Sequence, residues 1–258
     1  MQLTIHRRRL AALPAALLVV AAGLALGTQH GAASFAHRPF ASLGHGSHNA
    51  AWSSSNWSGY AKTGTYTSIT GKWTVPSVSA TSSATYSSTW IGIDGFTNSS
   101  LIQTGTEQDY YNGAAHYGAW WEILPAPATF VSLTVHAGDH MSASIKKSSS
   151  SNNWTITLSN TTTGKSFTTT KTYTGPHSSA EWIEEAPTVN SRQANLAHYK
   201  TFTFDPATAN GANPKISTSN RGVMIQNGKQ VSTPSNPDSD TDGFRAAYGA
   251  TAPSPPSS

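Results

Sequence analysis

The stretch STWIGIDGFTNSSLIQTGTEQ, residues 88 to 108, contains two short runs of β-branched and aromatic residues separated by an Asp94-Gly95 pair. Such runs favour strands, and Asp-Gly is a common turn signal between them. Successive side chains of a strand point to opposite faces, so Leu101, Gln103 and Gly105 share one face of the second run. Repetition of this pattern along the chain decides the fold class.

From about residue 55 onward the sequence keeps this character, with Gly, Asn, Pro and Ser between the runs. No segment long enough for a helix shows an apolar period near 3.6 residues. Strands are predicted at residues 71–75, 86–93, 101–105, 119–124, 130–136, 141–145, 154–158, 166–173, 180–184, 200–204 and 222–225. Many short strands with turns between them predict an all-β sandwich or barrel.

The N-terminus has the three-part layout of a secretory signal: Arg7-Arg8-Arg9, an apolar run from Leu10 to Leu26, and small residues up to Ala33. We therefore predict a signal peptide at 1–33, followed at 34–51 by a pro-segment or a disordered arm. Residues 52–246 are predicted to form one domain, and the Pro- and Ser-rich tail at 247–258 to be disordered. The mature protein is expected to be secreted, monomeric and free of the membrane.

Composition excludes several kinds of chemistry. Among 258 residues there are 16 Lys and Arg, 12 Asp and Glu, and no Cys, so disulfides, thiol catalysis and zinc–thiolate sites are ruled out. The Lys and Arg residues do not form a cluster of the kind that would predict nucleic-acid binding. Asp238, Asp240 and Asp242 alternate in a polar loop but lack the rest of a calcium loop. We predict no metal and no cofactor.

The scarce carboxylates include three in SSAEWIEEAP, residues 178–187. The period of two places Glu181 and Glu185 on one strand face and Glu184 on the other. Glu181 and Glu122 lie within aromatic or aliphatic runs, where buried charge is costly. Each is either a residue on a solvated strand face or a carboxylate with raised pKa in an aromatic-lined groove.

Six motifs together resemble the eqolisin-type glutamic peptidases, a family of pepstatin-insensitive acid proteases. They are NWSGY at 56–60, WTVP at 73–76, WIGIDG at 90–95 followed by LIQTG at 101–105, AWWEILP at 119–125, and AEWIEE at 180–185. The resemblance runs from about residue 56 to 246. It implies a β-sandwich of two bent antiparallel sheets, of the lectin-like jelly-roll kind, with a peptide substrate in the concave face.

By this resemblance the catalytic residues are Gln103 and Glu181. Glu181 would act as general base toward a water molecule, and the Gln103 amide would stabilise the oxyanion. The same motifs assign Trp90, Asp94, Trp120 and Glu122 to the substrate cleft or its immediate support. Departures from the fungal pattern are the lack of Cys, Gly118 where an acid often stands, and Ile123-Leu124 in place of an aromatic pair.

Two other functions fit a secreted β-sandwich with exposed aromatic residues. One is a carbohydrate-binding module or lectin. The other is a glycoside hydrolase that uses Glu122 and Glu181 as its carboxylate pair. Fold alone does not choose among them, and the Gln103 and Glu181 motifs favour the peptidase.

Overall fold

The computed structural model describes residues 34–43 and 50–258, so the predicted signal at 1–33 lies outside the described residues. Within the described residues the chain is almost entirely strands and loops, and the only helical element is a short 3-10 turn, η1 (Thr218–Asn220). No helix there has the length and apolar character needed to span a bilayer. The prediction of an all-β fold is confirmed.

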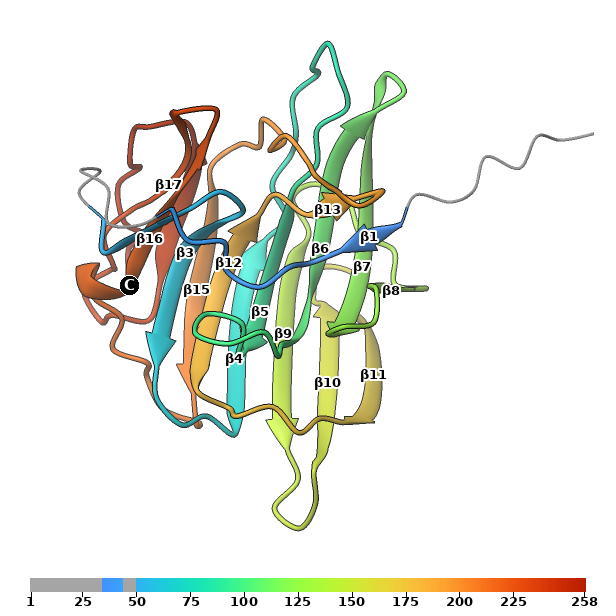
Figure 1. The fold of residues 1–258 in the computed structure, drawn as a ribbon, viewed down its shortest axis with the longest axis vertical. Coiled ribbons are helices and arrows are strands. Elements are labelled where there is room, and N and C mark those ends of the chain that lie inside the picture. Colours follow the sequence, from blue (N-terminus) through green and yellow to red (C-terminus); the bar gives the residue numbers. More distant parts are fainter. Residues whose placement is uncertain (1–33, 44–49) are drawn as a thin grey trace, which may run out of the picture. The chain divides into compact units, whose positions relative to one another are not determined.

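Fourteen strands of the described part form one continuous hydrogen-bonded path that folds over into two layers (Figure 1). One layer contains, in spatial order, β11 (Lys165–Thr172), β10 (Asn153–Asn160), β9 (His140–Lys147), β4 (Ser68–Thr74), β15 (Phe202–Ala209) and β18 (Phe244–Tyr248). The other continues with β17 (Lys229–Pro234), β16 (Arg221–Gln226), β3 (Trp57–Thr63), β12 (Ser179–Glu185), β5 (Ser88–Ile93), β6 (Ile102–Tyr111), β7 (Ala114–Ile123) and β8 (Thr129–Val131).

Two smaller pieces complete the sheet structure. β2 (Trp52–Ser54) pairs with β16 and is parallel to it, whereas the other pairings are antiparallel. A separate small sheet joins β1 (Phe35–Ala36), β13 (Thr188–Val189) and β14 (Arg192–Gln193). β1 thus comes from the segment that the sequence assigns to a pro-segment or disordered arm.

The main core lies between the two layers. Trp73 of β4 and Ile145 of β9 belong to the same buried cluster as Ile91 of β5 and Trp182 of β12. A second, smaller cluster lies on the opposite face of the second layer and contains several tryptophans, among them Trp57, Trp90 and Trp120. This arrangement confirms the predicted β-sandwich, with an aromatic-rich outer face on one layer.

The strand predictions are accurate in place and less accurate in length. β6 extends to Tyr111, well past the predicted end at 105, because the Asn112-Gly113 turn after it adopts positive φ at both residues and closes a long hairpin with β7. The strand predicted at 130–136 shortens to β8. β17 and β18 were not predicted, since their alternation is weak, and neither were β3 or the short strands β1, β2, β13 and β14. β18 runs to Tyr248, and the residues after it form neither helix nor strand.

Candidate active site

Sheet register brings the two predicted catalytic residues into one row. On β6, Gln103 lies opposite Gly92 of β5, and Gly92 lies opposite Glu181 of β12. On the other side, Gln103 lies opposite Glu122 of β7. Residues directly opposite in neighbouring strands project to the same face. Gly92 adds no side chain between Gln103 and Glu181, and the Trp90 ring and the Leu101 side chain lie over it instead.

The next row on this face contains the two predicted cleft tryptophans. Trp120 lies opposite Gly105, and Gly105 lies opposite Trp90. A Cβ at Gly105 would be 2.4 Å from the Cβ of Trp90, so only glycine permits this close approach. The Trp90 indole nitrogen donates to Glu185 Oε2 at 2.8 Å, which fixes the ring beside the catalytic row.

Gln103 and Glu122 are joined directly. The Gln103 Nε2 donates a hydrogen bond of 2.8 Å to Glu122 Oε2. Burial raises the pKa of Glu122 to about 7, against the opposing attraction of His37. The Gln103 Oε1 atom is buried and has no hydrogen-bond partner in the described structure. Glu122 therefore orients the Gln103 amide and leaves one of its N–H groups free.

Glu181 is fully buried, and neither of its carboxyl oxygens has a well-formed hydrogen bond among the described residues. Burial raises its pKa well above the usual value; the nearby Ser179 hydroxyl opposes this in part, and the charge on Asp94 adds to it. A carboxyl group that is buried with so little hydrogen bonding is costly and is characteristic of functional sites. Of the two interpretations left open for Glu181, a solvated strand face is wrong.

Asp94 has a supporting position rather than a place in the row. Its side chain accepts hydrogen bonds from the Tyr173 hydroxyl at 2.6 Å and from the backbone N–H groups of His177 and Ser178, both at 2.8 Å. Its own backbone is in the left-handed region, at φ 74°. Asp94 thus ties the turn after β5 to the loop that leads into β12 and Glu181.

Glu184 faces the main core, as the period of two requires. Thr89 Oγ1 donates to Glu184 Oε2 at 2.6 Å, and burial raises the pKa of Glu184 to about 8. Glu185 lies on the cleft face with Glu181 and is also fully buried. The three glutamates of residues 178–187 therefore belong to two different environments.

The cleft face is covered by residues 34–43. In Figure 1 this blue segment runs from β1 across β6, β5 and β12 toward β3. Phe35 packs edge-on against Phe130, with ring centroids 5.3 Å apart, and Phe40 packs against Phe96 at 4.8 Å. The Phe40 backbone N–H also donates to the Gly95 carbonyl at 3.0 Å. This segment occupies the face where the sequence predicted a substrate.

His37 lies at the centre of the covering segment. Its ring stacks on Trp120 with centroids 3.6 Å apart, and its two nitrogens are 2.9 Å from Glu107 Oε1 and 3.2 Å from Glu185 Oε2. Its backbone N–H donates to Glu122 Oε2 at 3.0 Å. Burial lowers the pKa of His37, but attraction by the two carboxylates outweighs it and raises the pKa well above its usual value.

Sequence analysis missed His37 and Glu107. Nothing in the irregular sequence around residue 37 marks a contact with a distant sheet. Glu107 had a signal: it continues the alternation of Gln103 and Gly105, and a longer predicted strand would have placed it on the cleft face.

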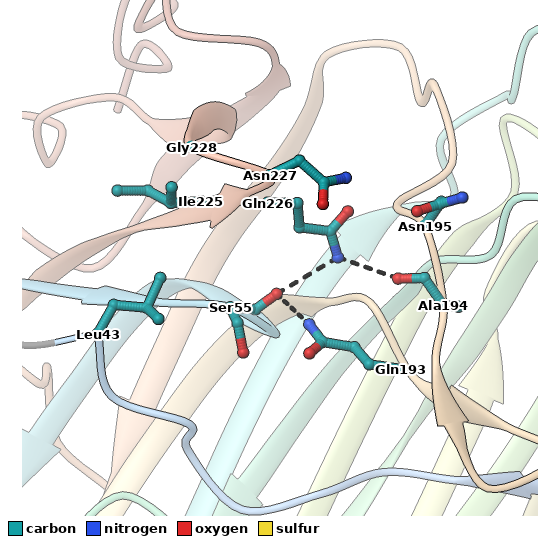
Figure 2. A pocket seen from close by; sticks show the side chains of 9 residues that line it. All are labelled: Leu43, Ser55, Gln193, Ala194, Asn195, Ile225, Gln226, Asn227 and Gly228. Carbon is teal, nitrogen blue, oxygen red and sulfur yellow. Dashed lines mark hydrogen bonds between the residues drawn. The ribbon is translucent and has the colours of Figure 1, made fainter.

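A different pocket lies between β14 and the turn from β16 to β17 (Figure 2). Its polar contacts include amide hydrogen bonds from Gln226 to the carbonyl oxygens of Ser55 and Ala194, at 3.3 and 3.0 Å, and one from the Gln193 amide to the same Ser55 carbonyl. None of its lining residues is titratable or belongs to the row of Gln103 and Glu181. We therefore place the candidate active site under residues 34–43.

Comparison with known proteins identifies the family of this chain. Residues 55–243 match the model of the Peptidase A4 family. Aspergillopepsin-2 of Aspergillus niger is 33% identical over 199 residues, which cover 66% of this chain and 70% of that protein. Scytalidopepsin B of Scytalidium lignicola is 33% identical over 161 residues, or 59% of this chain and 60% of that protein.

Solved structures of glutamic peptidases are also similar to this chain. A scytalido-glutamic peptidase crystallised with a transition-state analogue inhibitor superposes with a TM-score of 0.63 at 26% identity, and the match covers 75% of this chain and 98% of that one. The aspergilloglutamic peptidase of Aspergillus niger superposes with a TM-score of 0.53 at 26% identity, covering 64% of this chain and 99% of that one.

Proposed function

Because the chain belongs to the Peptidase A4 family and is a glutamic-type endopeptidase, we propose that Glu181 and Gln103 carry out its peptide-bond hydrolysis. Its substrates are proteins or peptides, and neither the carbohydrate-binding module nor the glycoside hydrolase is favoured. The observation that carries the proposal is the row in which Gly92 separates Gln103 from Glu181. The row puts an acid–base group and an amide donor on the same face of one layer, where both can act on a single scissile bond.

Glu181 acts as general base. When ionised, it takes a proton from the water that attacks the scissile carbonyl, and it then returns the proton to the leaving amine. The nearby Asp94 network holds the loop that leads into β12, and with it the strand that carries this carboxyl group. Because one carboxyl group must be both base and acid in a cycle, we expect activity to peak at acidic pH.

Gln103 stabilises the oxyanion of the tetrahedral intermediate. One amide hydrogen is held by Glu122, and the other is free to donate to the developing charge. A Glu122 with a pKa of about 7 is protonated in an acidic medium and still accepts this bond through its carbonyl oxygen. Trp120 and Trp90 form the apolar wall that lowers the local dielectric.

We also propose that residues 34–51 are a pro-segment and that the protein is released from the cell after loss of its signal peptide. The pro-segment is supported by the burial of the proposed catalytic residues: with residues 34–43 in place, Gln103 and Glu181 are completely buried. Burial also keeps Glu181 in its neutral form, in which it is not a base. Displacement of the segment would both admit substrate and hydrate this carboxyl group.

The catalytic proposal is tested on the secreted protein, with an unfolded protein as substrate at about pH 4. Glu181→Gln and Gln103→Ala should each lower kcat by at least about 100-fold, and Glu184→Gln is the matched control because it lies in the same strand but faces the core. Full activity in Glu181→Gln or Gln103→Ala would refute the assignment.

The pro-segment is tested in the full chain. His37→Asp places a fourth acid among Glu107, Glu122 and Glu185, so it should expel the segment and raise the cleavage of an added peptide. His198→Asp, at an exposed position, is the control. If both variants behave like the unaltered chain, the segment does not block the cleft.

A further inference from the structure

Three aspartates converge away from the active site. Asp205 belongs to β15, in the layer that does not carry Gln103 and Glu181. Asp238 and Asp242 belong to the loop between β17 and β18. One carboxylate oxygen from each of the three lies within 4.8 Å of the others. Ligands on opposite sides of a calcium ion, with bonds of about 2.4 Å, are about 4.8 Å apart, so one ion can reach all three.

A buried oxygen without a partner points into this cluster. Asp238 is 5% exposed, and its Oδ1 accepts the backbone N–H of Asp242 at 3.1 Å. Its Oδ2 is buried and has no hydrogen-bond partner in the described structure, and the same holds for Oδ1 of Asp242. Such oxygens are rarely left unsatisfied in a folded protein.

Gly243 allows the two segments to come together. A Cβ at this position would be 2.2 Å from Asp238 Oδ2 and 2.9 Å from the Cγ of Asp205. The absence of a side chain therefore lets the unpartnered oxygen face the carboxylate of β15. The loop is held in this place by the Ala207 N–H, which donates to the Asp242 carbonyl at 2.9 Å.

Negative charge at the cluster is poorly compensated. None of the three carboxyl groups forms an ion pair with a Lys, Arg or His of the described residues. Asp240 adds another carboxyl group to the same loop. Three or four acids with so little compensation need either protons or a bound cation.

We propose that Asp205, Asp238 and Asp242 form a calcium site that ties the β17–β18 loop to β15. The donors are all oxygen atoms, which suits a hard cation and not zinc or copper. Loop carbonyls and water would complete the coordination of Ca²⁺, which accepts irregular geometry more readily than Mg²⁺ does. Sequence analysis predicted no metal because Asp205 is remote from the alternating aspartates and only folding adds it to them.

Calcium binding is tested on the full chain carrying Glu181→Gln, which prevents self-digestion. After chelator treatment at about pH 7, titration with CaCl₂ should show one site with Kd of about 0.1–1 mM. About 10 mM calcium should raise the Tm by about 3–10 °C. MgCl₂ should have a much smaller effect. The absence of both heat of binding and Tm shift with CaCl₂ would overturn the proposal.

Variants identify the ligands. Asp238→Asn and Asp242→Asn should each weaken calcium binding by at least about tenfold, since each removes a charged ligand. Asp240→Asn is the matched control: it removes a charge from the same loop and leaves the three converging carboxylates intact, so binding should fall by less than about threefold. Asp242 is less buried than Asp238, so its variant remains informative if Asp238→Asn fails to fold. If Asp240→Asn and Asp242→Asn weaken calcium binding equally, the effect comes from the loss of negative charge in the loop and not from the loss of a ligand, and the proposed site is refuted.

Discussion

Substitution of Glu184 by glutamine should remove a large part of the pH dependence of stability without loss of activity. Glu184 has a pKa of about 8 in the folded protein, compared with 4.5 for an unperturbed glutamate. The folded state therefore holds a proton that the unfolded state releases above about pH 4.5. Stability should fall as the pH rises from about 4.5 to about 8 and then stay constant.

The size of the effect follows from the shift. One pKa unit corresponds to about 1.4 kcal/mol, so the shift of Glu184 corresponds to a loss of about 5 kcal/mol between pH 4 and pH 9. Glutamine is neutral at every pH and still accepts the hydrogen bond from Thr89. We expect the variant to lie within about 1 kcal/mol of the unaltered protein at pH 4 and to be more stable by about 3–5 kcal/mol at pH 9.

The measurement is urea unfolding followed by tryptophan fluorescence, at several pH values, in the inactive Glu181→Gln background. Peptidase activity is then measured in the single Glu184→Gln variant. Parallel stability curves for the two proteins would show that Glu184 is ionised in the fold, and the reasoning from its burial would be wrong. Loss of activity in Glu184→Gln would contradict its placement on the core side of β12.

Three further outcomes follow from the site. Gly92→Ala should lower kcat by at least about tenfold, because its Cβ would be 2.8 Å from the Trp90 ring and would push that ring out of place beside Gln103 and Glu181; unchanged kinetics would show that the row tolerates a side chain at this position. Asp94→Asn should lower the free energy of unfolding by about 1–3 kcal/mol in denaturant titrations, because a neutral amide replaces the carboxylate oxygens that accept the Tyr173 hydroxyl and two backbone N–H groups. His37→Ala in the full chain should make the 34–43 segment more accessible to an added protease at pH 7, since a buried imidazole between two carboxylates is lost; identical nicking of both proteins would contradict this.

The row of the site could be predicted from sequence in part. Alternation within AEWIEE and LIQTG placed Glu181 and Gln103 on particular strand faces, and the structure agrees because a half-buried strand has a fixed period of two. The alternation along one strand does not determine which strands pair with it. The position of Gly92 between Gln103 and Glu181 depends on the antiparallel register of three strands and emerged only with the fold.

Other features depended on contacts between remote segments. The irregular sequence around His37 carries no periodicity, so its place over Trp120 had no local signal. Asp205 joins Asp238 and Asp242 only because the β17–β18 loop packs against β15. By contrast, the turn at Asp94-Gly95 was predicted correctly, since both residues adopt the positive φ that this pair favours.

The short strand β1 has a consequence for how peptides are held. Phe35 and Ala36 pair with Val189 and Thr188 of β13, and this pairing uses main-chain groups of β13 that any extended peptide offers equally well. Once residues 34–43 leave, β13 becomes a free sheet edge beside the cleft, and a substrate can add to it as a strand. Recognition of this kind depends on hydrogen bonds to the peptide backbone rather than on particular side chains. It favours unfolded chains over folded ones as substrates, because their backbone groups are free to pair.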